Sequence, residues 1–140
     1  MHLSTNFSLW EFERSQTASR HKIDNKSPLE VINELQNLVE HVLQPLRNYV
    51  NRPINISSGY RSEKLNSMIG GSSKSQHIKG QAADIECFGM GNLELFDIIK
   101  KNFDYDQLIL EFHKVDYPNS GWVHISFNLG NNRFQDFSIG

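Results

Sequence analysis

Two segments far apart in the chain most constrain its fold. The first, Ser75 to Asp84, reads Ser-Gln-His-Ile-Lys-Gly-Gln-Ala-Ala-Asp, and the second, Gly121 to Ser126, reads Gly-Trp-Val-His-Ile-Ser. Two imidazoles and one carboxylate are ligands that a catalytic zinc can take from protein, with its fourth position left open. The sequence therefore predicts a Zn²⁺ site on His77, Asp84 and His124, and the fold must bring the two segments together.

Length and composition fit one compact domain over residues 1–140. With 140 residues and 38% hydrophobic content, the chain can bury a core without disulfides or structural metals. Its 14 basic and 16 acidic side chains give a net charge of −2, and the basic residues are scattered, which argues against a nucleic-acid partner. The single cysteine, Cys87, lies in an apolar run and is expected to be a buried thiol and not a nucleophile.

Residues 1–30 contain no unbroken apolar stretch. The sequence therefore predicts neither a secretory signal nor a membrane span, and no membrane partner. We expect synthesis in the cytoplasm, so that another agent would carry the protein to any substrate outside the membrane.

Capping signals predict where the first helices begin. Ser8 to Glu11 has the spacing of a capping box, and Ser27 to Glu30 repeats it ahead of an apolar stripe at helical spacing. This stripe predicts the main core helix. Pro45 lies in its last turns and is expected to kink or end the helix near Tyr49. The polar, aperiodic run 18–26 predicts a loop between the two helices.

The rest of the chain alternates between strand and helix signals. We expect a strand at 54–57, a short helix capped by Ser62, a strand at 82–87, a helix capped by Asn92, hairpin strands at 106–113 and 121–128, and a last strand near 134–138. This order favours an α+β fold, in which the N-terminal helices pack on one face of an antiparallel sheet and the zinc site lies on the other.

Strand periodicity predicts which candidate residues share a face. Side chains alternate across a strand, so Asp84, Glu111 and His124 project from one face if the more apolar face packs on the helices. His77 would reach over this face from its loop, and Gly80 would let that backbone run close to the metal. Zinc at this point would lower the pKa of its bound water and polarise a carbonyl, as amide hydrolysis needs.

This chemistry also needs a general base and a group that binds a carboxylate or an oxyanion. Glu111 is our first choice as base, since the hairpin could bring it near His124. Glu86 on the same face and Asp116 in the turn region are the alternatives. Arg61, which leaves the first strand through a tight turn, is expected to bind the substrate.

Three segments carry a resemblance to a known family, namely Ser58 to Ser62, Ser75 to Asp84 and Trp122 to His124. They resemble the zinc D-Ala-D-Ala carboxypeptidase family, which is related in fold to lysostaphin-type enzymes and to the hedgehog signalling domain. The likeness runs from about Phe7 through Phe127. It implies zinc on the two histidines and the aspartate, Arg61 in contact with substrate, and cleavage of cell-wall stem peptides. Within the family the chain is most similar to small single-domain members, many of them phage-borne.

One position departs from the family pattern. Better-known members carry the catalytic glutamate three residues before the last zinc histidine, where this chain has Gly121. The smaller members keep a glutamate at the end of the preceding strand, a position that the resemblance assigns to Glu111. Ser75 and Gln76 are expected to bind substrate backbone or to shape their loop, and Trp122 is expected to form part of the pocket wall.

The sequence leaves more than one function open. The first is a monomeric zinc metallopeptidase, endolysin-like, that cuts peptidoglycan stem peptides as a D-Ala-D-Ala carboxypeptidase or at a related endopeptidase bond. The alternative is a non-catalytic, zinc-stabilised module of the same fold that binds the cell wall or a protein, and Gly121 favours it. A metal-free structural subunit is the third. His113 is interpreted either as a support behind the metal site or as a strand-end residue.

Overall fold

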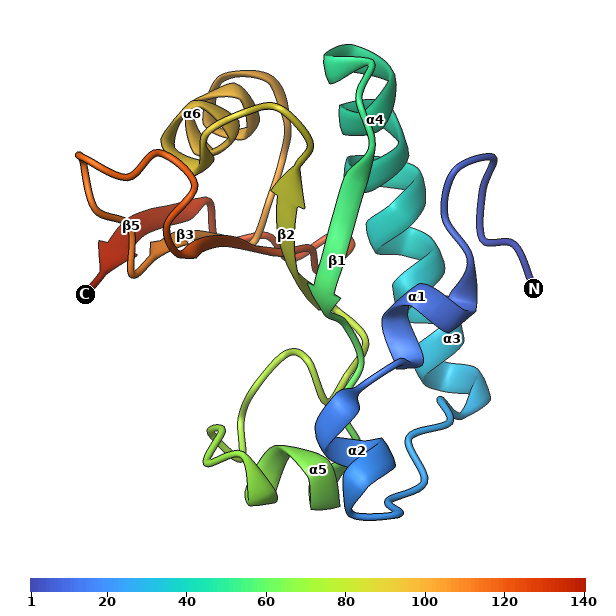
Figure 1. Cartoon of the computed structure of the whole chain (residues 1–140). Helices are drawn as coiled ribbons and strands as arrows, with labels where there is room; N and C mark the ends of the chain where they lie inside the picture. Colours follow the sequence, from blue (N-terminus) through green and yellow to red (C-terminus); the bar gives the residue numbers. More distant parts are fainter.

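A five-stranded sheet forms the centre of the computed structural model, which describes all residues 1–140 (Figure 1). Its strands are β1 (Ile54–Ser58), β2 (Ala82–Cys87), β3 (Gln107–Glu111), β4 (Trp122–Ser126) and β5 (Gln135–Ile139). The spatial order is β1-β2-β4-β3-β5, and every pair is antiparallel except β3 with β5. The predicted α+β fold is confirmed, and β5 adds one parallel pair at the edge.

Helices precede the sheet and connect its strands. They are α1 (Leu9–Glu13), α2 (Gln16–Arg20), α3 (Leu29–Leu38), the π-helical turn η1 (Val39–Leu43), α4 (Gln44–Val50), α5 (Glu63–Met68) and α6 (Asn92–Asn102). The predicted loop at 18–26 was partly wrong, because the Ser15 side chain accepts a hydrogen bond from Ala18 N and starts α2 there. None of these helices combines the length and hydrophobicity needed to span a bilayer.

The two predicted capping boxes had different outcomes. The box at Ser8 is present at the start of α1. At α3 the prediction was wrong, because Pro28 occupies the cap position and no side chain caps the helix. Ser27 instead donates its backbone N–H to Glu13 Oε2 at 2.7 Å. The same serine therefore ties the start of α3 to the end of α1.

Pro45 does not end the core helix, and it lies in the first turn of α4, directly after the π-helical turn η1. Proline lacks an N–H, and its ring clashes with the carbonyl four residues earlier in an α-helix. The chain widens into η1 just before it, where Gln44 N donates to the carbonyl oxygen of Val39, five residues back. The helix then continues to Val50 and stops at Asn51, whose backbone is left-handed. The predicted end near Tyr49 is confirmed to within one residue.

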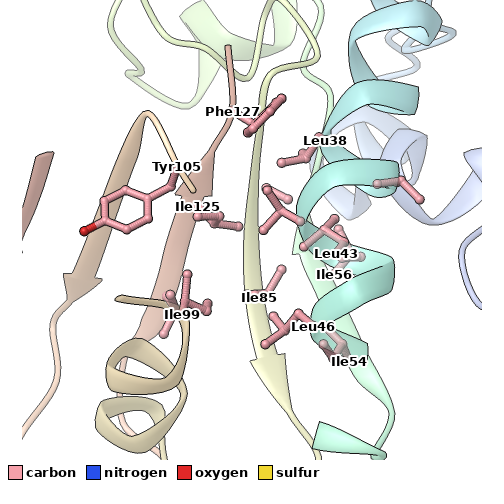
Figure 2. Packing of buried hydrophobic residues seen from close by; sticks show 14 of the residues in the cluster. Leu38, Leu43, Leu46, Ile54, Ile56, Ile85, Ile99, Tyr105, Ile125 and Phe127 are labelled. Carbon is pink, nitrogen blue, oxygen red and sulfur yellow. The ribbon is translucent and has the colours of Figure 1, made fainter. Parts of the chain in front are cut away.

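The helices and the apolar face of the sheet enclose one main core of 25 buried hydrophobic residues. Figure 2 shows Leu38, Leu43 and Leu46 of the long helix beside Ile56 of β1 and Ile85 of β2. The alternate, apolar positions of β3 and β4 complete the core together with α6. Burial of this surface contributes about 25 cal/mol per Å² to folding, which commits the other set of strand side chains to the opposite face.

Candidate metal centre

His77, Asp84 and His124 come together on the sheet face opposite the core. Their possible ligand atoms all lie within 4.8 Å of one another. Asp84 in β2 and His124 in β4 are direct cross-strand partners, and His77 reaches over from the loop before β2. Asp84 Oδ1 lies 3.1 Å from His124 Nδ1 and 3.4 Å from His77 Nε2. Zinc ligands about 2.1 Å from the ion in tetrahedral geometry lie about 3.4 Å apart, so this donor set fits one zinc ion.

A backbone carbonyl orients His77 for metal binding. The Nδ1 atom of His77 lies 2.7 Å from the carbonyl oxygen of Gly59. A carbonyl only accepts hydrogen bonds, so Nδ1 carries the proton and Nε2 stays free as a ligand. Gly59 is fixed by α1, because a Cβ at this position would lie 2.6 Å from the Cα of Phe12. The first helix thus positions a proposed ligand far from it in sequence.

Asp84 is held in its ionised form. Burial by itself raises the pKa of this carboxyl, but the adjacent imidazoles of His124 and His77 outweigh burial and hold the pKa well below its usual value. Arg61 Nη2 lies 3.5 Å from Asp84 Oδ2. Burial lowers the pKa of the Arg61 guanidinium, against the opposing effect of the carboxylates of Asp84 and Glu111. The carboxylate is therefore in the state that binds a metal ion.

A pocket of about 380 Å³ opens over this group. All eight side chains that the sequence analysis assigned to the site line it, namely Arg61, Ser75, Gln76, His77, Asp84, Glu111, Trp122 and His124. The alternative bases Glu86 and Asp116 do not line it. A larger groove, of about 1020 Å³, runs along α2 and β1 and shares Arg61 with the pocket, but none of the three proposed ligands lines it.

Glu111 is positioned at the end of β3 by its cross-strand partner. Trp122 Nε1 donates to Glu111 Oε2 at 2.9 Å, and the two residues face each other across β3 and β4. This hydrogen bond fixes one carboxylate oxygen and leaves Oε1 without a protein donor. A carboxylate is thus held in the pocket with one oxygen available to other groups.

Gly121 occupies a position that has no room for a side chain. Its φ is +68°, and a Cβ there would lie 1.9 Å from the carbonyl oxygen of Glu111. Asn92 was expected to cap α6, but it is the first residue of that helix and donates to the Gly121 carbonyl at 3.1 Å. The glutamate that better-known relatives carry three residues before the last histidine therefore has no place on this backbone.

Gly121→Ala is expected to lower the free energy of unfolding by more than Gly130→Ala does. Both glycines have positive φ, but a Cβ at Gly130 would meet nothing within 4 Å. The left-handed backbone costs an alanine about 1–2 kcal/mol at either site, and only Gly121→Ala adds the clash with Glu111. Urea denaturation of both variants measures the difference. Equal losses would contradict the close approach of β3 to β4.

Gly80 has a role that differs from the one expected, whereas His113 agrees with its interpretation as a strand-end residue. Gly80 does not face the metal group. Its φ is +75°, and a Cβ there would lie 2.7 Å from both Val31 Cγ1 and the Val31 carbonyl oxygen, so this glycine packs the metal-binding loop on α3. His113 Nδ1 lies 3.2 Å from the carbonyl oxygen of Ser120 and does not line the pocket. His113 therefore supports the β3–β4 connection.

A charged pair at the pocket was not predicted from the sequence, with Arg133 in the pocket lining and Asp106 buried beside it. The side chain of Asp106, 1% exposed, accepts hydrogen bonds from Nε and Nη2 of Arg133, each at 2.9 Å. Gln76 Nε2 donates to the same carboxylate at 2.7 Å. The hydrogen bonds from Arg133 lower the pKa of Asp106 against the effect of burial. An acidic residue at the start of an apolar strand was the only signal, and it does not reveal a partner so far along the chain.

Asp106→Asn is expected to lower the free energy of unfolding at neutral pH by about 2 kcal/mol, because hydrogen bonds to an ionised group contribute about 1.5–3 kcal/mol. The folded-state pKa of Asp106 is depressed, so its contribution is complete above the unfolded pKa of about 4 and is lost as pH falls through the folded value. The difference between wild type and variant should therefore shrink between about pH 7 and pH 3. Urea denaturation at both pH values tests this, and a constant difference would contradict it.

Two imidazoles and an ionised carboxylate at a pocket on a sheet, with a further carboxylate nearby, are the protein groups of a zinc metallopeptidase. A family model described as Peptidase M15 matches residues 5–126, and the chain belongs to this family. Zinc is its cofactor, since these peptidases are zinc-dependent and the His-Asp-His group can hold the ion. No match was found among curated proteins. The predicted family and cofactor are confirmed, and the roles of individual residues stay predictions.

Proposed function

We propose that this chain hydrolyses peptidoglycan stem peptides, at the D-Ala-D-Ala bond as a carboxypeptidase or at a related endopeptidase bond. One observation carries the proposal. The ligand atoms of His77, Asp84 and His124 lie within 4.8 Å of one another in a pocket that Glu111 and Arg61 also line. The proposed catalytic unit is one monomeric domain over residues 1–140.

In this proposal His77 holds zinc through Nε2, His124 through Nδ1, and Asp84 through its carboxylate. The distances of 3.4 and 3.1 Å from Asp84 Oδ1 to the two imidazole nitrogens support this assignment. When bound there, zinc supplies a Lewis acid that polarises the scissile carbonyl. The Gly59 carbonyl keeps the proton of His77 on the nitrogen that faces away from the metal.

Glu111 is the proposed general base. Its free carboxylate oxygen takes a proton from the attacking water and later donates it to the leaving amine nitrogen. The hydrogen bond from Trp122 to the other oxygen limits rotation of the carboxylate. Glu86 and Asp116 lie outside the pocket lining, which supports Glu111 among the three candidates.

Arg61 is proposed to bind a substrate carboxylate or the developing oxyanion. Its Nε donates to Ser58 Oγ at 3.2 Å, its Nη1 to Asn66 Oδ1 at 3.4 Å, and its Nη2 lies 3.5 Å from Asp84. These contacts are longer than the 2.7–2.9 Å of strong charge-assisted hydrogen bonds. A substrate oxygen can therefore compete for this guanidinium.

Ser75 and Gln76 are proposed to shape the metal-binding loop. Ser75 Oγ accepts a hydrogen bond from His77 N at 3.2 Å. Gln76 Nε2 donates to Gln81 and to Asp106, which occupies both of its N–H groups. Of the two roles that the sequence allowed, these contacts favour loop positioning over direct binding of substrate backbone.

Digestion of purified peptidoglycan tests the proposed function. Zinc-loaded protein is expected to release D-alanine or shortened stem peptides that mass spectrometry identifies, and chelation should stop the release until zinc is restored. Released D-alanine would assign a carboxypeptidase, and internal stem fragments would assign an endopeptidase. Stoichiometric zinc without any cleavage would instead favour the non-catalytic binding module.

A further inference from the structure

Two guanidinium groups lie on opposite sides of the metal centre. Strands β1 and β5 form the two edges of the sheet (Figure 1). Arg61 lies three residues after β1, and Arg133 lies two residues before β5. The strands that carry Asp84 and His124 lie between them. Both arginines line the same pocket, although Arg133 lies beyond the 5–126 region that matches the family.

Arg133 is held by shorter hydrogen bonds than Arg61, and its side chain is more exposed. Its Nε and Nη2 form a two-point contact with Asp106, each at 2.9 Å, and its backbone N–H donates to the same carboxylate at 2.8 Å. Gln76 holds that carboxylate from the other side. Nη1 of Arg133 makes no hydrogen bond within the protein, and the side chain is 49% exposed. A fixed guanidinium with free N–H groups at a pocket is suited to binding a carboxylate.

The two ends of β3 carry different side chains at the pocket, with the carboxylate of Glu111 at one end and the guanidinium of Arg133 near the other. Glu111 lies at the end of the strand, and Gln107, the neighbour of Asp106, lies at the start. Ile109 is the cross-strand partner of His124 and marks the level of the metal centre. Gln107 lies two residues before Ile109 along β3, which corresponds to a distance of about 7 Å along the strand. Arg133 and Asp106 belong to that end, because Gln107 pairs with Gln135 of β5.

We propose that Arg133, positioned by Asp106, is a specificity-determining residue that binds a second carboxylate of the substrate, on a residue about two positions from the scissile bond. This inference rests on the proposed peptidase function. The preferred substrate is then an acidic peptide with one carboxylate near Arg61 and another near Arg133. Lys74, which also lines the pocket, adds a third positive charge beside those of Arg61 and Arg133.

Paired peptides test this proposal. Stem-type peptides of equal length are compared, each with a single carboxylate replaced by a carboxamide. For wild type, kcat/KM is measured by mass spectrometry, and Kd is measured by calorimetry on zinc-loaded Glu111→Gln protein. At the position about two residues from the scissile bond, the acid is expected to exceed the amide by about 10- to 100-fold in kcat/KM and in the association constant, 1/Kd. Arg133→Gln should bring that ratio close to one and leave the values for the amide peptide unchanged.

The control is Arg52→Gln, which removes the same charge from a side chain outside the pocket that donates a hydrogen bond to the Gly89 carbonyl, and it should leave the ratio intact. If Arg133→Gln does not fold, Arg133→Lys is the second variant. Lysine keeps a positive charge beside Asp106 but lacks the planar guanidinium, whose free N–H groups would bind the substrate carboxylate. The preference for the acid peptide over the amide should therefore be lost in this variant too. Equal losses for acid and amide peptides would show a purely structural pair and overturn the proposal. So would a wild type that shows no acid preference.

The two proposals fail in different ways. A binding preference for the acid without turnover of any peptide would contradict the peptidase function and leave the carboxylate site standing. Turnover without an acid preference that depends on Arg133 would support the peptidase function and contradict the carboxylate site. Absence of both binding and turnover for every peptide would contradict both proposals.

Discussion

Asp84→Asn is expected to reduce bound zinc from one ion per chain to nearly none, and peptidase activity by at least about 1,000-fold. Asp84 supplies the proposed oxygen ligand and lies between His124 and His77. Metal binding contributes several kcal/mol of transition-state stabilisation, and each 1.36 kcal/mol corresponds to a factor of ten in rate. Metal analysis by mass spectrometry after dialysis, with a peptide cleavage assay, measures both effects.

The matched control for this substitution is Glu86→Gln, two residues further along β2. Glu86 is a carboxylate of the same strand that lies outside the pocket lining. This variant should keep both zinc and activity, which separates loss of the ligand from loss of any acidic side chain in β2. Undiminished zinc in Asp84→Asn would show that the three-residue group is not the metal centre.

Glu111→Gln is expected to lower kcat by about 100- to 10,000-fold, the usual contribution of a general base, with zinc content unchanged. Glutamine keeps the shape of the side chain and can still accept the hydrogen bond from Trp122, but it cannot take a proton from water. Steady-state kinetics with a stem-type peptide measures kcat, and metal analysis of the same protein measures the zinc content.

Asp116→Asn serves as the control for Glu111→Gln, because Asp116 is an exposed alternative base outside the pocket. Its kinetics should equal those of wild type. If Glu111→Gln retained wild-type kcat while Asp116→Asn lost it, the base would be in the β3–β4 connection. Loss of activity with zinc retained in Glu111→Gln would show that this residue acts in catalysis and not in metal binding. That result would favour the peptidase over a zinc-stabilised binding module.

Much of the fold could be predicted because its signals are local. Alternation in β2, β3 and β4 gave the correct face for Asp84, Glu111 and His124, since the core takes one set of positions and leaves the other in the pocket. The same local reasoning was wrong at Ser27, where the distant carboxylate of Glu13 binds the serine that would otherwise cap α3. Helix signals act within a few residues, and a partner from another element can override them.

The amino-acid sequence by itself determined the proposed donor set for zinc and the strand faces that carry two of its members, because side-chain direction within a regular element depends only on its period. Only the tertiary structure decided which carboxylate stands in the pocket, why Gly121 admits no side chain, and that Arg133 meets Asp106. These features depend on how loops and separate strands approach one another in space. That approach is set by packing between elements distant in the chain, and no local pattern of residues records it.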